Sequence, residues 1–143
     1  MKVTKPLTLT LVFLSLIGCS TEKSPSQIYE EYNSRVTDGV SYEEEKAYYT
    51  KQKQQEVESK LPQYMKQMNK SRDDVIELYL NLSREVAKCK EITLDSEVIE
   101  GDTALLEYSQ KDVCGNKSAT TEKQKVRMKN EGGWKIDEVV ISL

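Results

Sequence analysis

The chain has 143 residues, of which 37% are hydrophobic and 31% charged, and its formal net charge is −3. The length suits one domain, and this composition excludes both a membrane protein with several spans and a fully disordered chain. The sequence contains no histidine. This absence excludes Ser-His-Asp and Cys-His catalytic arrangements, acid–base chemistry by imidazole, and most zinc and copper sites.

The first 18 residues have the pattern of a secretory signal peptide. Lys2 and Lys5 precede an apolar run over residues 6–17. This run is shorter than the roughly 20 residues that a membrane-spanning helix needs. We therefore expect residues 1–18 to be removed from the mature protein.

The apolar run ends in Leu-Ile-Gly-Cys at residues 16–19, which resembles the bacterial lipobox. The resemblance implies cleavage between Gly18 and Cys19 and acylation of Cys19, and two or more acyl chains hold a protein stably to a membrane. An Asp after the cysteine favours the inner membrane of Gram-negative bacteria, but Ser20 stands there. We therefore expect a lipid-anchored protein on the periplasmic face of the outer membrane. The alternative is an ordinary signal peptide, or an uncleaved anchor, with an incidental cysteine.

The mature chain, residues 19–143, keeps 19 basic and 24 acidic residues, a net charge of −5. An acidic chain without a basic cluster argues against nucleic acid as a partner. It also argues against electrostatic attachment to a membrane, so the N-terminal lipid is the expected link. We expect a lipidated tether at residues 19–24 and a single domain at residues 25–143.

Capping boxes mark the starts of the first two helices. Ser24 and Gln27 form one box around a proline at the first helical position, and Asp-Gly at residues 38–39 predicts the end of this helix. Ser41 and Glu44 form the second box. They predict a long polar helix, which we expect to be solvated and to fray midway until the next proline interrupts it.

The third predicted helix is the most apolar. Ser71 is its expected N-cap, and apolar side chains then recur at helical spacing. The stripe consists of Val75, Leu78, Tyr79, Leu82 and Val86. It predicts a helix that packs centrally against a sheet.

From residue 91 the hydrophobic period changes to that of β-strands. Four alternating runs follow, at residues 92–98, 103–113, 120–129 and 134–142. In the last run the apolar positions change parity, which predicts a β-bulge near Asp137. Helices followed by antiparallel hairpins predict an α+β fold, with N-terminal helices packed on a curved antiparallel sheet of about four strands.

An oxidising compartment favours a disulfide between Cys89 and Cys114, since Cys19 is used for the lipid. The hairpin between them has two alternative registers. A two-residue turn places Cys89 opposite Cys114, whereas a three-residue loop gives a better apolar face and places Cys89 opposite Val113. A bulge in either strand would reconcile the two registers. Two free thiols are the competing interpretation.

The order of these features spans nearly all of the mature chain: lipobox, short helix, Ser-Tyr-Glu-Glu helix at residues 41–44, apolar helix, hairpin, and the closing Gly-Gly-Trp-Lys-Ile-Asp at residues 132–137. It resembles small bacterial lipoproteins of unknown function with a cystatin-like, or nuclear-transport-factor-2-like, domain. The resemblance implies a cone-shaped sheet wrapped around helices, often with a pocket and often dimeric. It carries no shared catalytic residues.

Some members of this fold superfamily are isomerases or dehydratases that use an acid with Tyr or His inside the cone. Four residues are candidates for such a pocket here: Tyr79, Tyr108, Asp95 and Glu107. A Tyr–acid pair can polarise a carbonyl group, but the competing interpretation makes both tyrosines packing residues. The glutamates at residues 43–45 point in different directions from a helix, so we expect them to be solvated rather than to bind a cation.

Trp134 is the only tryptophan, and the mature chain has no phenylalanine. It follows a Gly-Gly turn and shares its face with Ile136. We therefore expect it to mark the core, between the last strand and the helix over residues 73–88. The alternative is an exposed anchor for a partner, a role that the tyrosines at residues 29, 32, 48 and 49 could share.

These features predict a lipoprotein that acts as a non-catalytic binding or accessory domain, without cofactor or metal. Its expected partner is an unknown protein or small molecule. The resemblance also implies that two copies of the chain form a homodimer. Two alternatives are an immunity lipoprotein that neutralises a periplasm-directed toxin and a small-molecule enzyme of the isomerase type. An open pocket with a buried acid near Tyr79 or Tyr108 would favour the enzyme. A closed core with an exposed tyrosine patch would favour a protein partner.

Overall fold

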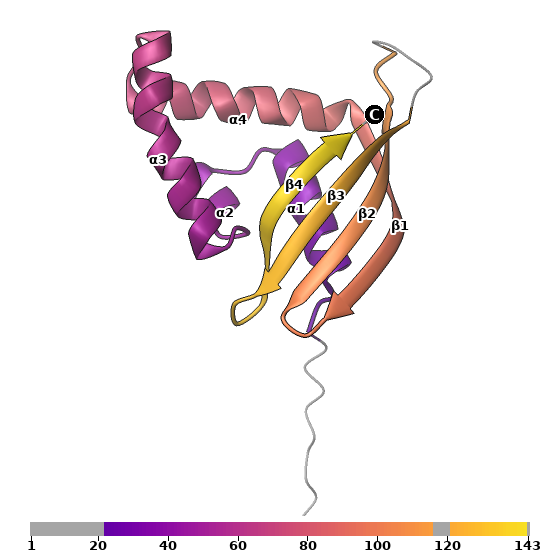
Figure 1. Ribbon diagram of the computed structural model, residues 1–143. Coiled ribbons are helices and arrows are strands. Elements are labelled where there is room, and N and C mark those ends of the chain that lie inside the picture. Colours follow the sequence, from indigo (N-terminus) through magenta and orange to yellow (C-terminus); the bar gives the residue numbers. More distant parts are fainter. Residues whose placement is uncertain (1–21, 116–120, 143) are drawn as a thin grey trace, which may run out of the picture.

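The computed structural model describes residues 22–115 and 121–142, so Gly18 and Cys19 of the predicted lipobox lie outside the described residues. The fold is α+β, with four helices followed by a four-stranded antiparallel sheet of order β1-β2-β3-β4 (Figure 1). The helices are α1 (Pro25–Asp38), α2 (Tyr42–Lys46), α3 (Lys51–Met68) and α4 (Arg72–Lys88). The strands are β1 (Lys90–Glu100), β2 (Thr103–Asp112), β3 (Glu122–Asn130) and β4 (Trp134–Ser142).

Local capping signals place most of the helix starts. Capping boxes begin α1, α2 and α4, which confirms the starts predicted from Ser24, Ser41 and Ser71. Gly39 ends α1 with φ 101°, a conformation that favours glycine. Among the described residues, no helix is long and apolar enough to cross a membrane.

The single long helix predicted after Ser41 is two helices, α2 and α3, separated by a short connection. α2 ends after five residues, and the next segment reaches the sheet: Thr50 N donates to Ile136 O at 3.0 Å, and Ile136 N donates to Tyr48 O at 2.8 Å. Thr50 then caps α3, so the stretch expected to fray is the ordered start of a helix. Pro62 lies inside α3, and the predicted interruption there is wrong. Packing of the neighbouring Leu61 in a buried cluster offsets the hydrogen bond that the proline removes.

The first hairpin uses both predicted registers. Between Ser96 and the turn, the strands follow the register of the two-residue turn. Between Lys90 and Leu94 they follow the register of the three-residue loop, because a bulge at Asp95 separates the two parts. Cys89 and Cys114 form the predicted disulfide, which joins the C-terminal end of α4 to the residues just after β2. A second irregularity at Asp137 in β4 confirms the predicted change of parity.

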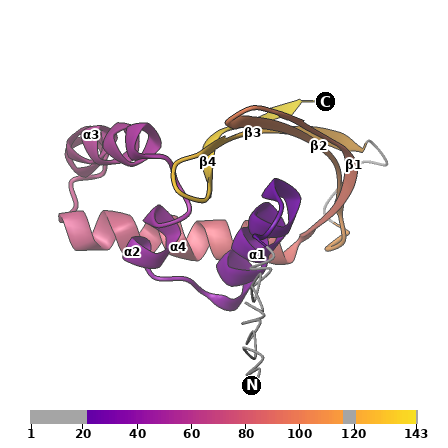
Figure 2. The same cartoon turned by 90° about the horizontal axis from the view of Figure 1, so that it is seen from below.

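The sheet arches over α1, and the main core lies between its concave face and that helix (Figure 2). The buried side chains of this core come mostly from β2, β3 and β4, with two tyrosines added from the helical half. They are Tyr29, Tyr49, Ala104, Leu106, Tyr108, Val126, Met128 and Ile136. α1 thus occupies the position that the sequence suggested for α4.

α4 does not pack centrally against the sheet, so that prediction is wrong. Of its apolar stripe only Val75 is buried, and Leu82 is 58% exposed. α4 lies along one end of the sheet. Its N-terminal part extends past β4 and there lies beside α3 (Figures 1 and 2). Because α1 fills the concave face, most of the apolar face of α4 is left facing solvent.

Trp134 lies at the margin of the core. Its side chain is half-buried and packs against the main core from one side. It lines a shallow hollow with Ile28 of α1 and with Ala47 and Tyr48 of the segment after α2. The predicted packing against α4 is therefore wrong, because α1 and this segment cover the start of β4.

Candidate functional site

An open cleft of about 780 Å³ lies between α4, α1 and the concave face of β3 and β4. We call it the sheet–α4 cleft. Leu82 and Val86 of α4 line it on one side, and Val139 and Ile141 of β4 line it on the other. Leu82 and Ile141 are 58% and 56% exposed, so both walls present aliphatic side chains to solvent.

The floor of the sheet–α4 cleft carries a chain of polar side chains. The Tyr29 hydroxyl donates to Gln124 Oε1 at 3.0 Å, and Gln124 Nε2 donates to Gln110 Oε1 at 2.6 Å. Gln110 Nε2 donates to Glu122 Oε2 at 2.5 Å, and Lys90 Nζ lies 3.2 Å from the same oxygen. Each glutamine amide therefore uses half of its hydrogen-bonding capacity on other described residues.

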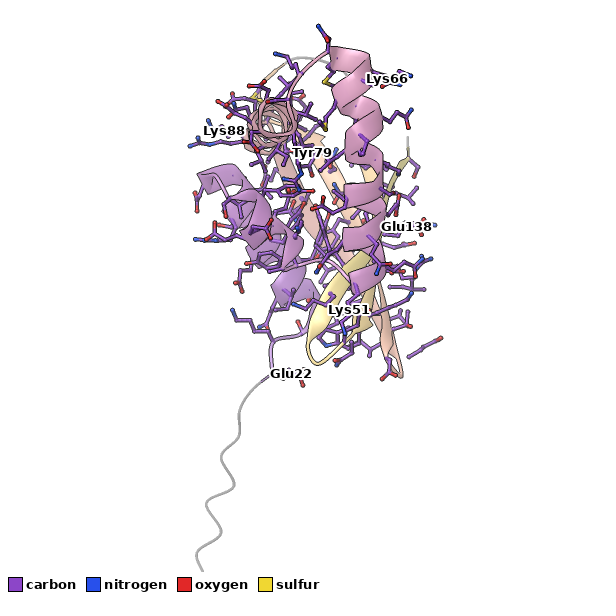
Figure 3. The ribbon with its side chains drawn as sticks, turned by 90° about the vertical axis from the view of Figure 1, so that its left-hand side faces the viewer. Glu22, Lys51, Lys66, Tyr79, Lys88 and Glu138 are labelled. Carbon is purple, nitrogen blue, oxygen red and sulfur yellow. A yellow bond between two sulfur atoms is a disulfide. The ribbon has the colours of Figure 1, made fainter. Side chains whose placement is uncertain are left out.

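The inner end of the cleft adjoins a buried carboxylate. Glu45 of α2 is 1% exposed, and its Oε1 accepts hydrogen bonds from the hydroxyls of Tyr32 at 3.1 Å, Tyr49 at 3.0 Å and Tyr79 at 2.9 Å. We call these four residues the tyrosine–glutamate cluster. Tyr32 and Tyr49 also line the cleft, and Tyr79 lies between α4 and α3 (Figure 3).

The tyrosine hydroxyls of this region are held in the protonated form. Burial raises the pKa of Tyr29 and of Tyr79 to about 12. Burial also raises the pKa of Tyr32 and Tyr49, and the negative charge of Glu45 adds to this effect. At neutral pH all four hydroxyls are therefore hydrogen-bond donors.

The position of Glu45 corrects a prediction. Glu43 and Glu44 are exposed as expected, but Glu45 is not solvated. A helix turns about 100° per residue, so three consecutive glutamates spread over about 200°, and in α2 the covered side takes in Glu45. The sequence signal that could have found the contact is the spacing of Glu45 and Tyr49, which are four residues apart.

The four residues predicted to share a pocket are separated in the structure. Tyr79 joins the tyrosine–glutamate cluster. Tyr108 is fully buried with its ring 5.2 Å from that of Tyr29, and its hydroxyl has no hydrogen-bond partner among the described residues. The predicted pairing of a tyrosine with Asp95 or Glu107 does not form.

Both predicted acids lie on the opposite, convex face of the sheet. Asp95 accepts a hydrogen bond from Ser109 and pairs with Lys123 at 2.7 Å. Glu107 pairs with Lys125 at 3.4 Å. The alternation of β2 explains this placement, because Leu106 and Tyr108 on either side of Glu107 point into the core.

A second hollow of about 290 Å³ lies between α3 and α4. Its lining is almost wholly apolar and includes Leu61 and Val75, which are buried, and Tyr64, Met68 and Leu78, which are exposed. Leu82 lines both this hollow and the sheet–α4 cleft.

Comparisons with protein-family models, with curated proteins and with solved structures find no match to this chain. Within residues 22–115 and 121–142, no three His, Cys, Asp or Glu side chains are grouped so as to hold a metal ion.

Proposed function

We propose that this chain is an outer-membrane lipoprotein that faces the periplasm and acts by binding, without catalysis, through the sheet–α4 cleft. The observation that carries the proposal is the solvent exposure of aliphatic side chains on both walls of the cleft, Leu82 and Val86 opposite Val139 and Ile141. Large contiguous apolar surfaces on soluble proteins mark binding sites. A cleft with apolar walls and a few polar groups on its floor is the usual form of such a site.

The expected anchor is compatible with an accessible cleft. The lipobox at residues 16–19 supports attachment of lipid at Cys19. Glu22, the first described residue, lies at the end of the molecule away from α4 (Figure 3). A tether at that end would leave the sheet–α4 cleft directed away from the membrane. The arch of the sheet over α1 supports assignment to the cystatin-like, or nuclear-transport-factor-2-like, cone.

A small-molecule enzyme is the second candidate, favoured by one observation: a buried acid, Glu45, lies beside Tyr79 at the inner end of an open cleft. A general base must come within hydrogen-bond reach of the proton that it removes. Glu45 is 1% exposed, and one of its oxygens already accepts three tyrosine hydroxyls. The geometry therefore supports a structural role for this carboxylate better than a catalytic one. The immunity lipoprotein remains one form of the binding function.

The binding proposal is tested with an apolar fluorescent dye, 1-anilinonaphthalene-8-sulfonate, and the chain from Ser20 onward. We expect Leu82→Gln to reduce dye fluorescence several-fold and Leu105→Gln to leave it unchanged. The two leucines are comparably exposed, at 58% and 52%, but Leu105 lies on the convex face. Absence of dye binding to the native protein, or equal loss in both variants, would refute the assignment of the cleft.

A further inference from the structure

The outer edge of β4 is only partly covered. β4 is an edge strand, and residues 48–50 pair with it at Ile136. From residue 137 to residue 142, no backbone group forms a hydrogen bond on that side with any described residue. Figure 1 shows this edge on the side of the sheet nearest α3. Backbone N–H and C=O groups on an open strand edge are a template for another strand.

The two edges of the sheet differ in their protection against such pairing. β1 carries five charged side chains, Lys90, Glu91, Asp95, Glu97 and Glu100. Residues 139–142 of β4 are Val-Val-Ile-Ser, without charge or proline. Charged residues and prolines are the usual devices that keep edge strands from pairing. Residues 139–142 lack both, and within the uncovered stretch the charge is confined to Asp137 and Glu138 at its start.

The cleft beside this edge also fits an extended chain. Val139 and Ile141 point into the sheet–α4 cleft, and Leu82 and Val86 of α4 line its other wall. Every second side chain of a strand beside β4 would enter this apolar space. The spare amide capacity of Gln110 and Gln124 on the floor suits peptide groups or small polar side chains.

We propose that the cleft binds an extended apolar segment of a partner protein, which adds to β4 as a fifth strand. The inference rests on the proposed function and names the chemistry of the occupant. It continues the backbone pairing that residues 48–50 begin at Ile136. A single foreign segment fits better than a second copy. If β4 of a second copy paired here, its β3 would lie beside it on the outer side, where α3 and α4 already lie just beyond this edge (Figures 1 and 2).

The test uses the mature lipoprotein in nanodiscs of neutral lipid and a short fluorescent peptide of alternating valine and threonine with lysine at both ends. Ile141 and Val140 provide matched variants, since they are adjacent, 56% and 48% exposed, and on opposite faces. We expect fluorescence anisotropy to show binding to the native protein and to Val140→Lys. We expect Ile141→Lys to weaken binding by roughly tenfold or more, because an inward-pointing charge blocks strand addition.

A second peptide of the same sequence, with the backbone nitrogens of its valines and threonines methylated, has the same charge and cannot donate these backbone hydrogen bonds. We expect it not to bind. Equal binding of both peptides would overturn strand addition while leaving the cleft as a binding site. Absence of binding by either peptide, or equal weakening in both lysine variants, would also overturn the inference. A dimer detected by light scattering in detergent, and dissociated only by Ile141→Lys, would identify a second copy as the occupant instead.

Discussion

Glu45 connects three separate segments of the chain through one carboxylate oxygen. Tyr32 belongs to α1, Tyr49 to the connection between α2 and α3, and Tyr79 to α4. The hydroxyl oxygens of Tyr32 and Tyr49 also lie 3.0 Å from each other. A buried acceptor shared by three hydroxyl donors stabilises the packing of the segments that carry them, because each donor would otherwise lose this partner.

Removal of this acceptor should destabilise the fold. We expect Glu45→Ala to lower the free energy of unfolding by about 2–4 kcal/mol, because it leaves buried hydroxyls without a partner. Glu45→Gln should cost less, since the amide oxygen still accepts a hydrogen bond. Urea denaturation followed by far-ultraviolet circular dichroism measures both.

Glu43→Ala is the matched control, because Glu43 is exposed on the same helix. Its effect should stay within about 0.5 kcal/mol, as for most surface substitutions. If Glu45→Ala were equally mild, the tyrosine–glutamate cluster would have no stabilising role.

The raised pKa values of two tyrosines also predict how stability depends on pH. Tyrosine ionises near pH 10 in an unfolded chain, whereas the pKa of Tyr29 and Tyr79 is raised to about 12 in the fold. Between these values the unfolded chain binds fewer protons than the native one, so the free energy of unfolding should fall as pH rises from about 10 to 12. Urea titrations at several alkaline pH values measure this slope. A flat profile across this interval would contradict the assigned burial.

At the scale of secondary structure, the residues of the apolar stripe of α4 differ in how deeply they are buried. Val75 is buried in a cluster with Tyr42 and Leu61, whereas Leu82 projects into the cleft. We expect Val75→Ala to cost about 1–2 kcal/mol and Leu82→Gln less than about 0.5 kcal/mol. Thermal or urea unfolding of the two variants decides this. A larger cost for Leu82→Gln would mean that α4 packs as its hydrophobic pattern alone suggests.

The sequence predicts those elements whose determinants are local. Ser24, Ser41 and Ser71 identify helix starts because capping involves residues three apart, and the parity of β4 identifies the bulge at Asp137 for the same reason. Cysteine count, compartment and hairpin register together predict the disulfide that the structure contains.

Features that depend on long-range contacts could not be predicted in this way. The break before Thr50 follows from the hydrogen bonds that Thr50 N and Tyr48 O form with Ile136 in β4. Both α1 and α4 have an apolar face, and the sequence does not show which of them the sheet covers. Because α1 takes that place, Trp134 packs beside α1, and Glu45 contacts tyrosines up to 34 residues away in the sequence.

At the scale of the whole molecule, the proposed attachment to a membrane rests on the lipobox residues that end at Cys19. We expect the mature protein to carry acyl chains at Cys19 and Cys19→Ala to abolish signal processing at this site and lipid attachment. Mass spectrometry of the purified protein and fractionation of cells measure these outcomes. A mature protein without acyl chains would refute the lipobox assignment.

The sheet–α4 cleft, and not another face, is the proposed binding surface. Val86 in the cleft and Val98 on the convex face are the same residue type and similarly exposed, at 58% and 49%. A photo-crosslinking amino acid is placed at position 86 or at position 98 of the full chain, and intact cells are irradiated. We predict a cross-linked product of higher mass from position 86 and none from position 98. The same products from both positions, or none from position 86, would contradict the account.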